Sequence, residues 1–164
     1  MLLEEFDCLI EKTVETIKEH YKTRLVSIVL FGSCSRRTQH YHSDIDMLII
    51  LSECEKGKMA RQTEFIENID NKLEEDFNKL TQSNIHTKIS PVVKTKNEIE
   101  QGHLLLYEMT ESCQIMYDPT LFMTHFLDEM KEKMKLAGVK KTSQGYWIMP
   151  EDIFPQQSRE KTNE

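Results

Sequence analysis

Two short apolar runs separated by a polar interval constrain the fold of this chain more than any other feature. The first run, LVSIVLF, spans residues 25–31 and ends at Gly32, and the second, DIDMLIILS, spans residues 44–52. Runs of this length, rich in Val, Ile and Leu and bounded by turn residues, are typical of buried β-strands. We therefore expect two core strands joined by the interval 32–43.

The rest of the chain alternates between helical and extended patterns. Apolar residues recur at helical spacing over residues 2–21, and a long helix is expected over about 58–80. A third strand is expected at 86–94 and a short one at 113–118, with partly helical sequence between them and a helix at about 119–137. This alternation predicts an α/β domain.

Length and composition predict a single domain. The 164 residues fit one domain over 1–150, with a core at about 20–118, followed by a polar tail at 151–164. No apolar run reaches the ~20 residues of a membrane span, and the acidic N-terminus lacks the pattern of a signal peptide. We therefore expect a cytoplasmic protein without a membrane segment.

The charge limits the kinds of partner. A net charge of -7 argues against general binding to a nucleic-acid backbone. It leaves room for a local basic patch, and the candidates are Arg36 with Arg37 and Lys140 with Lys141. The small size and apolar helices also leave room for a homodimer.

Asp44 and Asp46 begin the second apolar run. Their spacing places both carboxylates on one face of a strand, where two like charges are costly unless a cation lies between them. Hard carboxylate oxygens are ligands for Mg²⁺. Taken alone, the same pattern also fits solvated acids at the start of a strand, so the metal interpretation depends on the turn that precedes it.

The turn after the first run can hold a phosphate. Gly32 allows close approach of the backbone, while Ser33 and the N–H groups of the turn can bind an anion. Arg36 follows one turn later and can reach a phosphate or the aspartates. A phosphate cradle facing a metal pair is the arrangement needed for phosphoryl or nucleotidyl transfer.

The segment GSCSRRTQHYHSDIDMLI resembles the signature of the DNA polymerase β-like nucleotidyltransferase superfamily. It is similar in particular to the minimal nucleotidyltransferases of prokaryotes, and later segments such as ISPVVKTKNEIE and QIMYDP resemble a mainly archaeal subgroup of them. The positions that match the signature are Gly32, Ser33, Arg36, Ser43, Asp44, Ile45 and Asp46. Arg37 stands where the family usually has a second glycine.

The resemblance implies a mixed β-sheet with helices packed on it, and a nucleoside triphosphate substrate, most often ATP, used with Mg²⁺. Gly32 and Ser33 would hold the β- and γ-phosphates, and Arg36 and Ser43 would complete the nucleotide-binding residues. Asp44 and Asp46 would be the catalytic metal ligands. A hydroxyl would attack the α-phosphate, accept AMP and release pyrophosphate.

One departure from the family concerns a third carboxylate, which usually lies on the next core strand. Here that strand, HTKISPVV, contains no acid, and Lys88 or Ser90 falls near the expected position. Glu98 is the nearest later candidate for the missing acid. The missing acid leaves open a domain that binds nucleotide without turnover. The resemblance also suggests a second alternative, an antitoxin-like partner of a HEPN-type toxin.

Overall fold

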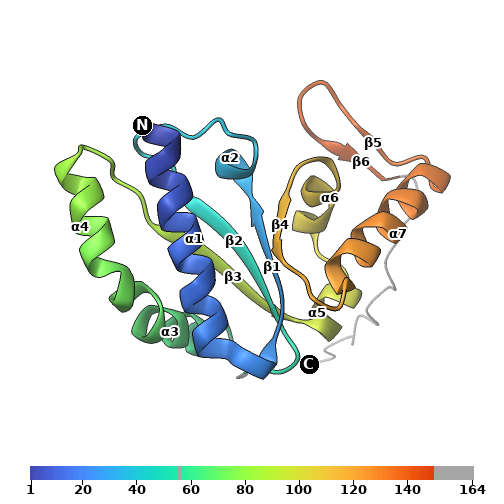
Figure 1. The fold of residues 1–164 in the computed structure, drawn as a ribbon. Helices are drawn as coiled ribbons and strands as arrows, with labels where there is room; N and C mark the ends of the chain where they lie inside the picture. The colour runs from blue at the N-terminus through green and yellow to red at the C-terminus, as the bar shows by residue number, and fades with distance from the viewer. Residues whose placement is uncertain (55–56, 150–164) are drawn as a thin grey trace, which may run out of the picture.

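A four-stranded sheet forms the centre of the computed structural model, which describes residues 1–54 and 57–149 (Figure 1). The strand order is β3-β2-β1-β4. The strands are β1 (Leu25–Phe31), β2 (Ile45–Leu51), β3 (Ile89–Thr95) and β4 (Gln114–Tyr117). Both predicted core strands are present, and the second begins one residue after Asp44.

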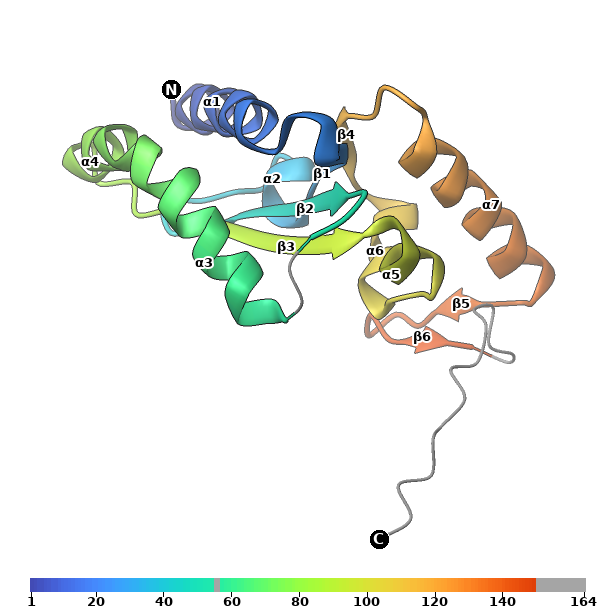
Figure 2. The same cartoon turned by 90° about the horizontal axis from the view of Figure 1, so that it is seen from below.

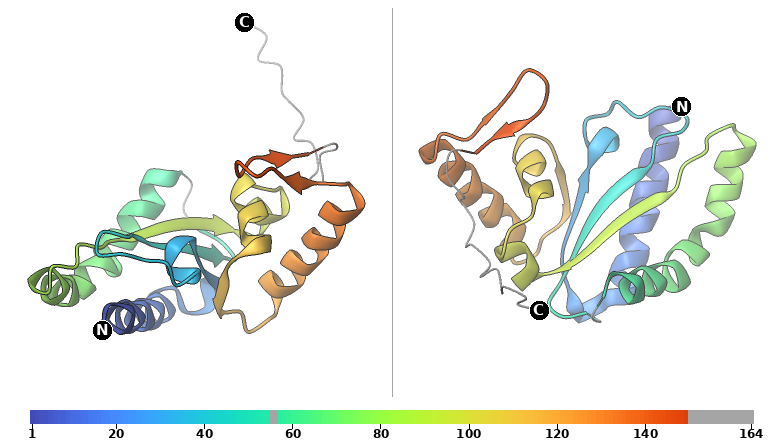
Figure 3. Two further views of the ribbon diagram at one scale, coloured as in Figure 1. Left: turned by 90° about the horizontal axis from the view of Figure 1, so that it is seen from above. Right: turned by 180° about the vertical axis from the view of Figure 1, so that it is seen from behind.

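The sheet is mixed, as expected. β1 pairs with β2 and with β4 in antiparallel fashion, whereas β2 and β3 are parallel. Because β2 and β3 run the same way, they begin at the same end of the sheet. The short helix α2 (Gly32–Ser35), which follows β1, lies at this end (Figure 3).

Helices cover both faces of the sheet (Figure 2). One face packs against α1 (Leu2–Tyr21), α3 (Lys58–Asn68) and α4 (Glu74–Gln82). The other packs against α5 (Lys96–Glu100), α6 (Leu104–Glu111) and α7 (Phe122–Leu136). Since side chains alternate along β2, Met47 and Ile49 enter the first core cluster, and Leu48 and Ile50 enter the second. The hydrophobic core of the described structure thus extends into α1, before residue 20.

The helix expected at 58–80 is interrupted, and that prediction is wrong. The 3₁₀ turn η2 (Asp70–Leu73) separates α3 from α4. Ile69 leaves the helical conformation with φ of -123°, and both Ile69 and Leu73 are buried in the core. Residues four apart also share one face of a continuous helix, so burial of these two side chains does not by itself account for the break.

The remaining elements follow the first and the last helix of the described structure. A second 3₁₀ turn, η1 (Lys22–Arg24), joins α1 to β1, and a small hairpin of β5 (Lys140–Lys141) and β6 (Trp147–Ile148) follows α7. The third strand begins at Ile89 rather than at residue 86. The predicted tail at 151–164 lies outside the described residues. None of the described helices combines the length and apolar character needed to cross a membrane.

Candidate active site

The register of β1 and β2 brings the Gly-Ser turn against an aspartate. Phe31, the last residue of β1, is paired with Asp46 of β2, so the next residue, Gly32, lies beside the Asp46 side chain. Gly32 has φ of +71°, and a Cβ atom at this position would lie only 2.2 Å from Asp46 Oδ2. Any other residue would be strained in this conformation and would have to displace the Asp46 carboxylate.

A buried thiol joins the turn to the start of β2. Cys34, the third residue of α2, is buried, and its Sγ donates a hydrogen bond to the Asp44 carbonyl oxygen at 3.5 Å. Burial raises the pKa of Cys34 to about 11, against a smaller lowering by the Ser33 hydroxyl. The thiol therefore stays protonated, and its hydrogen bond connects α2 to the backbone of Asp44.

Asp46 is half-buried and costly to ionise. Burial raises its pKa, and the neighbouring charge of Asp44 adds to this effect. A hydrogen bond from Ser90 and the charge of Arg36 act in the opposite direction without cancelling the rise. A cation bound to both carboxylates would remove the repulsion between them.

β3 supplies Ser90, and the residue directly before it is Lys88, so neither position provides an acid. The parallel register pairs Asp46 with Ser90, whose hydroxyl reaches the carboxylate. Lys88 Nζ lies 3.6 Å from Asp44 Oδ2. Each aspartate thus has one partner from this segment, as the position of these two residues in the sequence had suggested.

Glu98 does not take the place of the third acid, so that suggestion is wrong. Its carboxylate accepts hydrogen bonds from Arg61 Nη1 at 2.8 Å and from Thr95 N at 2.7 Å. With Thr95 it forms the capping box that begins α5. The described residues contain no group of three or more His, Cys, Asp or Glu side chains arranged for a metal ion. The donors present, two carboxylates and a hydroxyl, suit Mg²⁺ that also binds substrate phosphates.

Arg36 and Ser43 occupy different environments. Arg36 directly follows α2 and is exposed, and its charge acts on both Asp46 and Glu108. Ser43 is buried, and its Oγ accepts a hydrogen bond from His40 N at 2.9 Å. In the structure described here, Ser43 therefore shapes the loop before the aspartates.

Arg37 stands where the resembling sequences usually have glycine, and its backbone has the left-handed conformation that favours glycine. Its φ is +58°, in the left-handed region that costs a non-glycine residue roughly 1–2 kcal/mol. Its guanidinium pairs with Asp7 of α1 at 2.9 Å. Lys141 pairs with Glu108 and with Glu111, each at 2.7 Å. Arg37 and Lys141, two candidates for a basic patch, are thus each paired with carboxylates.

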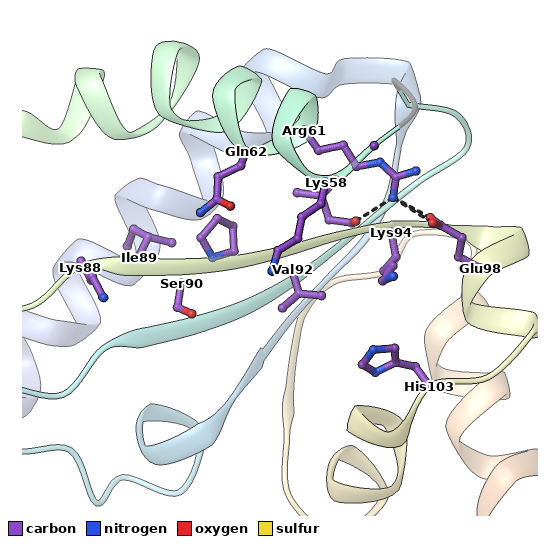
Figure 4. Close-up of a pocket in the computed structure, with 13 residues that line it drawn as sticks. Lys58, Arg61, Gln62, Lys88, Ile89, Ser90, Val92, Lys94, Glu98 and His103 are labelled. Carbon is purple, nitrogen blue, oxygen red and sulfur yellow. Dashed lines mark hydrogen bonds and ion pairs between the residues drawn. The ribbon is translucent and has the colours of Figure 1, made fainter.

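A basic groove along β3 was missed by the sequence reasoning. It has a volume of about 600 Å³ and runs between α3 and the start of α6 (Figure 4). We call it the β3 groove; its lining includes Lys58, Arg61, Lys88, Ser90, Val92, Lys94, Glu98 and His103. The signal was present in KISPVVK, residues 88–94, where even spacing places both lysines on one face of a strand.

The sequence matches a family model described as polymerase beta, nucleotidyltransferase, over residues 11–111. The chain belongs to this family. The matched region spans α1 to α6 and contains the Gly-Ser turn, both aspartates and β3. A comparison with curated protein sequences found no match.

A comparison with solved structures also found similar chains. One is a toxin–antitoxin complex with AMP-PNP, with 17% identity, a TM-score of 0.49, and 78% of this chain and 92% of that chain covered. Another is the toxin–antitoxin MntA-HepT, with 12% identity, a TM-score of 0.45, and 80% and 92% covered. A third is spectinomycin adenyltransferase AAD(9) from Enterococcus faecialis with ATP and spectinomycin, with 15% identity, a TM-score of 0.47, and 79% and 65% covered.

Proposed function

We propose that this family member is a Mg²⁺-dependent nucleotidyltransferase that transfers AMP from ATP to a hydroxyl group. The observation that carries the proposal is the contact between Gly32 and Asp46. Because a Cβ at Gly32 would lie 2.2 Å from Asp46 Oδ2, a triphosphate resting on the turn would be within reach of the aspartates. One nucleotide can therefore touch both parts of the site.

Each residue then has a defined task. The first backbone N–H groups of α2 lack helical partners, and with the Ser33 hydroxyl they would hold the β- and γ-phosphates. Asp44 and Asp46 would hold Mg²⁺, which neutralises phosphate oxygens and lowers the pKa of an attacking hydroxyl when bound. Arg36 would balance the charge that develops on the phosphates in the transition state.

The reaction is an in-line displacement. The acceptor oxygen forms a bond to the α-phosphorus while the bond from that phosphorus to the bridging oxygen of pyrophosphate breaks. The proton of the acceptor hydroxyl leaves to solvent or to a carboxylate of the site. The protein contributes mainly by positioning the reactants and neutralising their charge.

The test is transfer of label from α-labelled ATP to components of a cell extract, with and without Mg²⁺. We expect Asp44→Asn with Asp46→Asn to lower transfer by at least ~10³-fold, because two metal ligands are removed. Asp128→Asn, which removes an exposed carboxylate of α7, serves as the matched control and should retain activity. Equal transfer by the double variant and the control would contradict the proposal.

Further measurements separate this enzyme from the two alternatives, a nucleotide-binding domain without turnover and a partner of a HEPN-type toxin. ATP binding measured by calorimetry without pyrophosphate release would indicate a nucleotide-binding domain without turnover. Label on a protein band that survives nuclease treatment would indicate a protein acceptor, as expected for the HEPN-type partner that the resemblance implies. That partner stays a prediction, and co-purification with an all-helical ribonuclease would test it directly.

A further inference from the structure

We infer that the β3 groove binds the acceptor, and that the acceptor is a hydroxyl compound carrying phosphate groups. This inference rests on the proposed function and names the substrate class for the second half of the same site. Four observations carry it: the position of the groove relative to the Gly-Ser turn, its contact with the aspartates, its charge and its apolar floor.

The groove lies on the opposite side of the aspartates from the Gly-Ser turn. The strand order is β3-β2-β1, the turn follows β1, and Asp46 lies on the central strand of these three. A triphosphate on the turn and a ligand in the groove would therefore approach Asp46 from opposite sides. In-line displacement needs the attacking and leaving oxygens on opposite sides of the phosphorus, so the acceptor enters from β3.

One end of the groove reaches the aspartates directly. Ser90 lines the groove, and its hydroxyl also donates a hydrogen bond to Asp46. Lys88 lies beside Asp44. Figure 4 shows Lys88, Ser90 and Val92 pointing to the same side of β3, while Ile89 points to the other. Continuing this alternation, Lys94 lies about 20 Å beyond Lys88, given roughly 3.3 Å per residue. An acceptor whose hydroxyl lies at the Ser90 end of the groove would have its other groups directed toward Lys94.

The lining is basic although the chain as a whole is acidic. Among the residues that the structure describes, Lys58, Lys88, Lys94 and Arg61 line the groove with one carboxylate, that of Glu98. Glu98 is already bound by Arg61 at 2.8 Å. Among residues 1–54 and 57–149, no carboxylate lies at ion-pair distance from Lys58 or Lys94. In a chain of net charge -7, such a surface selects an anion and disfavours a cationic acceptor.

The floor suits the neutral part of a phosphate compound. Pro91, Val92 and Val93 are half-buried and line the groove between its lysines. Lysine binds phosphate as a point charge without imposing a fixed geometry. The shared chemistry is thus a hydroxyl near one or more phosphates, supplied either by the 3′ end of a short single-stranded oligonucleotide or by a free sugar phosphate.

The first test measures binding without ATP or metal. The probes are a fluorescein-labelled hexaribonucleotide, followed by anisotropy, and glycerol phosphate, followed by calorimetry. The variant Lys58→Gln with Lys94→Gln is compared with Lys133→Gln with Lys135→Gln, which removes two exposed charges from α7. Circular dichroism checks that both variants are folded.

We expect the groove variant to bind at least one probe about 10-fold more weakly than wild type, and the α7 control to stay within about 2-fold. For the oligonucleotide, the slope of log affinity against log salt should fall by about 1.4, or about 0.7 for each phosphate that a lysine no longer neutralises. Tight binding of the hexaribonucleotide alone identifies a polynucleotide end, and tight binding of glycerol phosphate identifies a small phosphate ester. Binding of neither probe to wild type, or equal weakening by both variants, overturns the inference.

The second test follows label transfer with saturating ATP. The groove variant should raise the KM for the acceptor about 10-fold while ATP affinity stays unchanged, because its lysines contact only the acceptor. Transfer to a neutral or protein acceptor at equal rates in both variants overturns the inference and leaves the proposed function intact. If Asp44→Asn with Asp46→Asn does not lower transfer but the groove still binds phosphate, the proposed function and the acceptor role of the groove both fail, and only phosphate binding by the groove stands.

Discussion

Asp46, within β2, and Asp118, directly after β4, are both half-buried, but the surrounding structure shifts their pKa values in opposite directions. Asp118, after β4, accepts hydrogen bonds from Ser27 Oγ at 2.6 Å, Thr124 N at 2.9 Å and Thr124 Oγ1 at 2.7 Å. Burial works against ionisation, but these bonds together with that from Met123 N lower its pKa. At Asp46, burial and Asp44 raise the pKa, and Ser90 is the donor that opposes them.

The difference shows which carboxylate serves the fold and which is available for a ligand. The charge of Asp118 is satisfied within the protein, and it holds the first turn of α7 to β1. The charge of Asp46 has fewer hydrogen-bond donors and is close to the carboxylate of Asp44. Such an arrangement lowers stability unless a cation binds, and it is the kind of compromise found at functional sites.

The largest effect expected from a single substitution comes from filling the space beside Asp46. Gly32→Ala should lower label transfer by at least about 10²-fold, because the added Cβ would displace the Asp46 carboxylate, which we propose binds the metal, by an ångström or more. Steady-state transfer assays measure the decrease. Gly145→Ala is the control, since Gly145 has φ of +86° but nothing within 4 Å of its Cβ position. Equal decreases in the two variants would show that backbone strain alone, and not the contact with Asp46, matters.

A smaller effect is expected from removing the charge of Asp118. Asp118→Asn should lower the free energy of unfolding at pH 7 by about 2 kcal/mol, since hydrogen bonds to a charged group contribute about 1.5–3 kcal/mol. Urea denaturation measures this change. Transfer activity at a temperature where the variant is folded should stay within a few-fold of wild type. A large drop in the activity of the folded variant would break the distinction between the two aspartates.

The smallest effect concerns the pH dependence of stability in the absence of divalent cations. The lowered pKa of Asp118 stabilises the fold above its ordinary value of about 3.9, and this contribution is lost as the pH falls through the lowered pKa. The difference between wild type and Asp118→Asn should therefore shrink in acid.

Asp46 should show the opposite sign. Its raised pKa favours folding below its ordinary value, and this contribution is lost as the pH rises through the raised pKa. Asp46→Asn should therefore have a higher Tm than wild type at pH 7, and the gain should disappear as the pH falls toward about 4. Thermal unfolding at several pH values measures both trends. A lower Tm for Asp46→Asn at pH 7 would mean that Asp46 is already satisfied within the protein.

Local pattern was sufficient to place the first two core strands, while the chemistry of the turn stays a prediction. The apolar runs predicted β1 and β2 to within one residue. The spacing from Gly32 to Asp46 predicted that the glycine turn follows β1 and that the two acids lie at the start of β2. These features depend on residue type and on neighbours in the sequence, so they can be read from the sequence alone. The mixed sheet and the nucleotidyltransferase family followed from the resemblance and are confirmed.

Only the tertiary structure decided which partner each charge has. Asp44, Asp46 and Asp118 are chemically identical in the sequence, and their different environments come from strand register and burial. The pairing of Asp46 with Ser90, the role of Glu98 in a capping box and the break between α3 and α4 all depend on contacts between distant segments. Burial and hydrogen bonding set the cost of a charge, and both arise when segments far apart in the chain pack together.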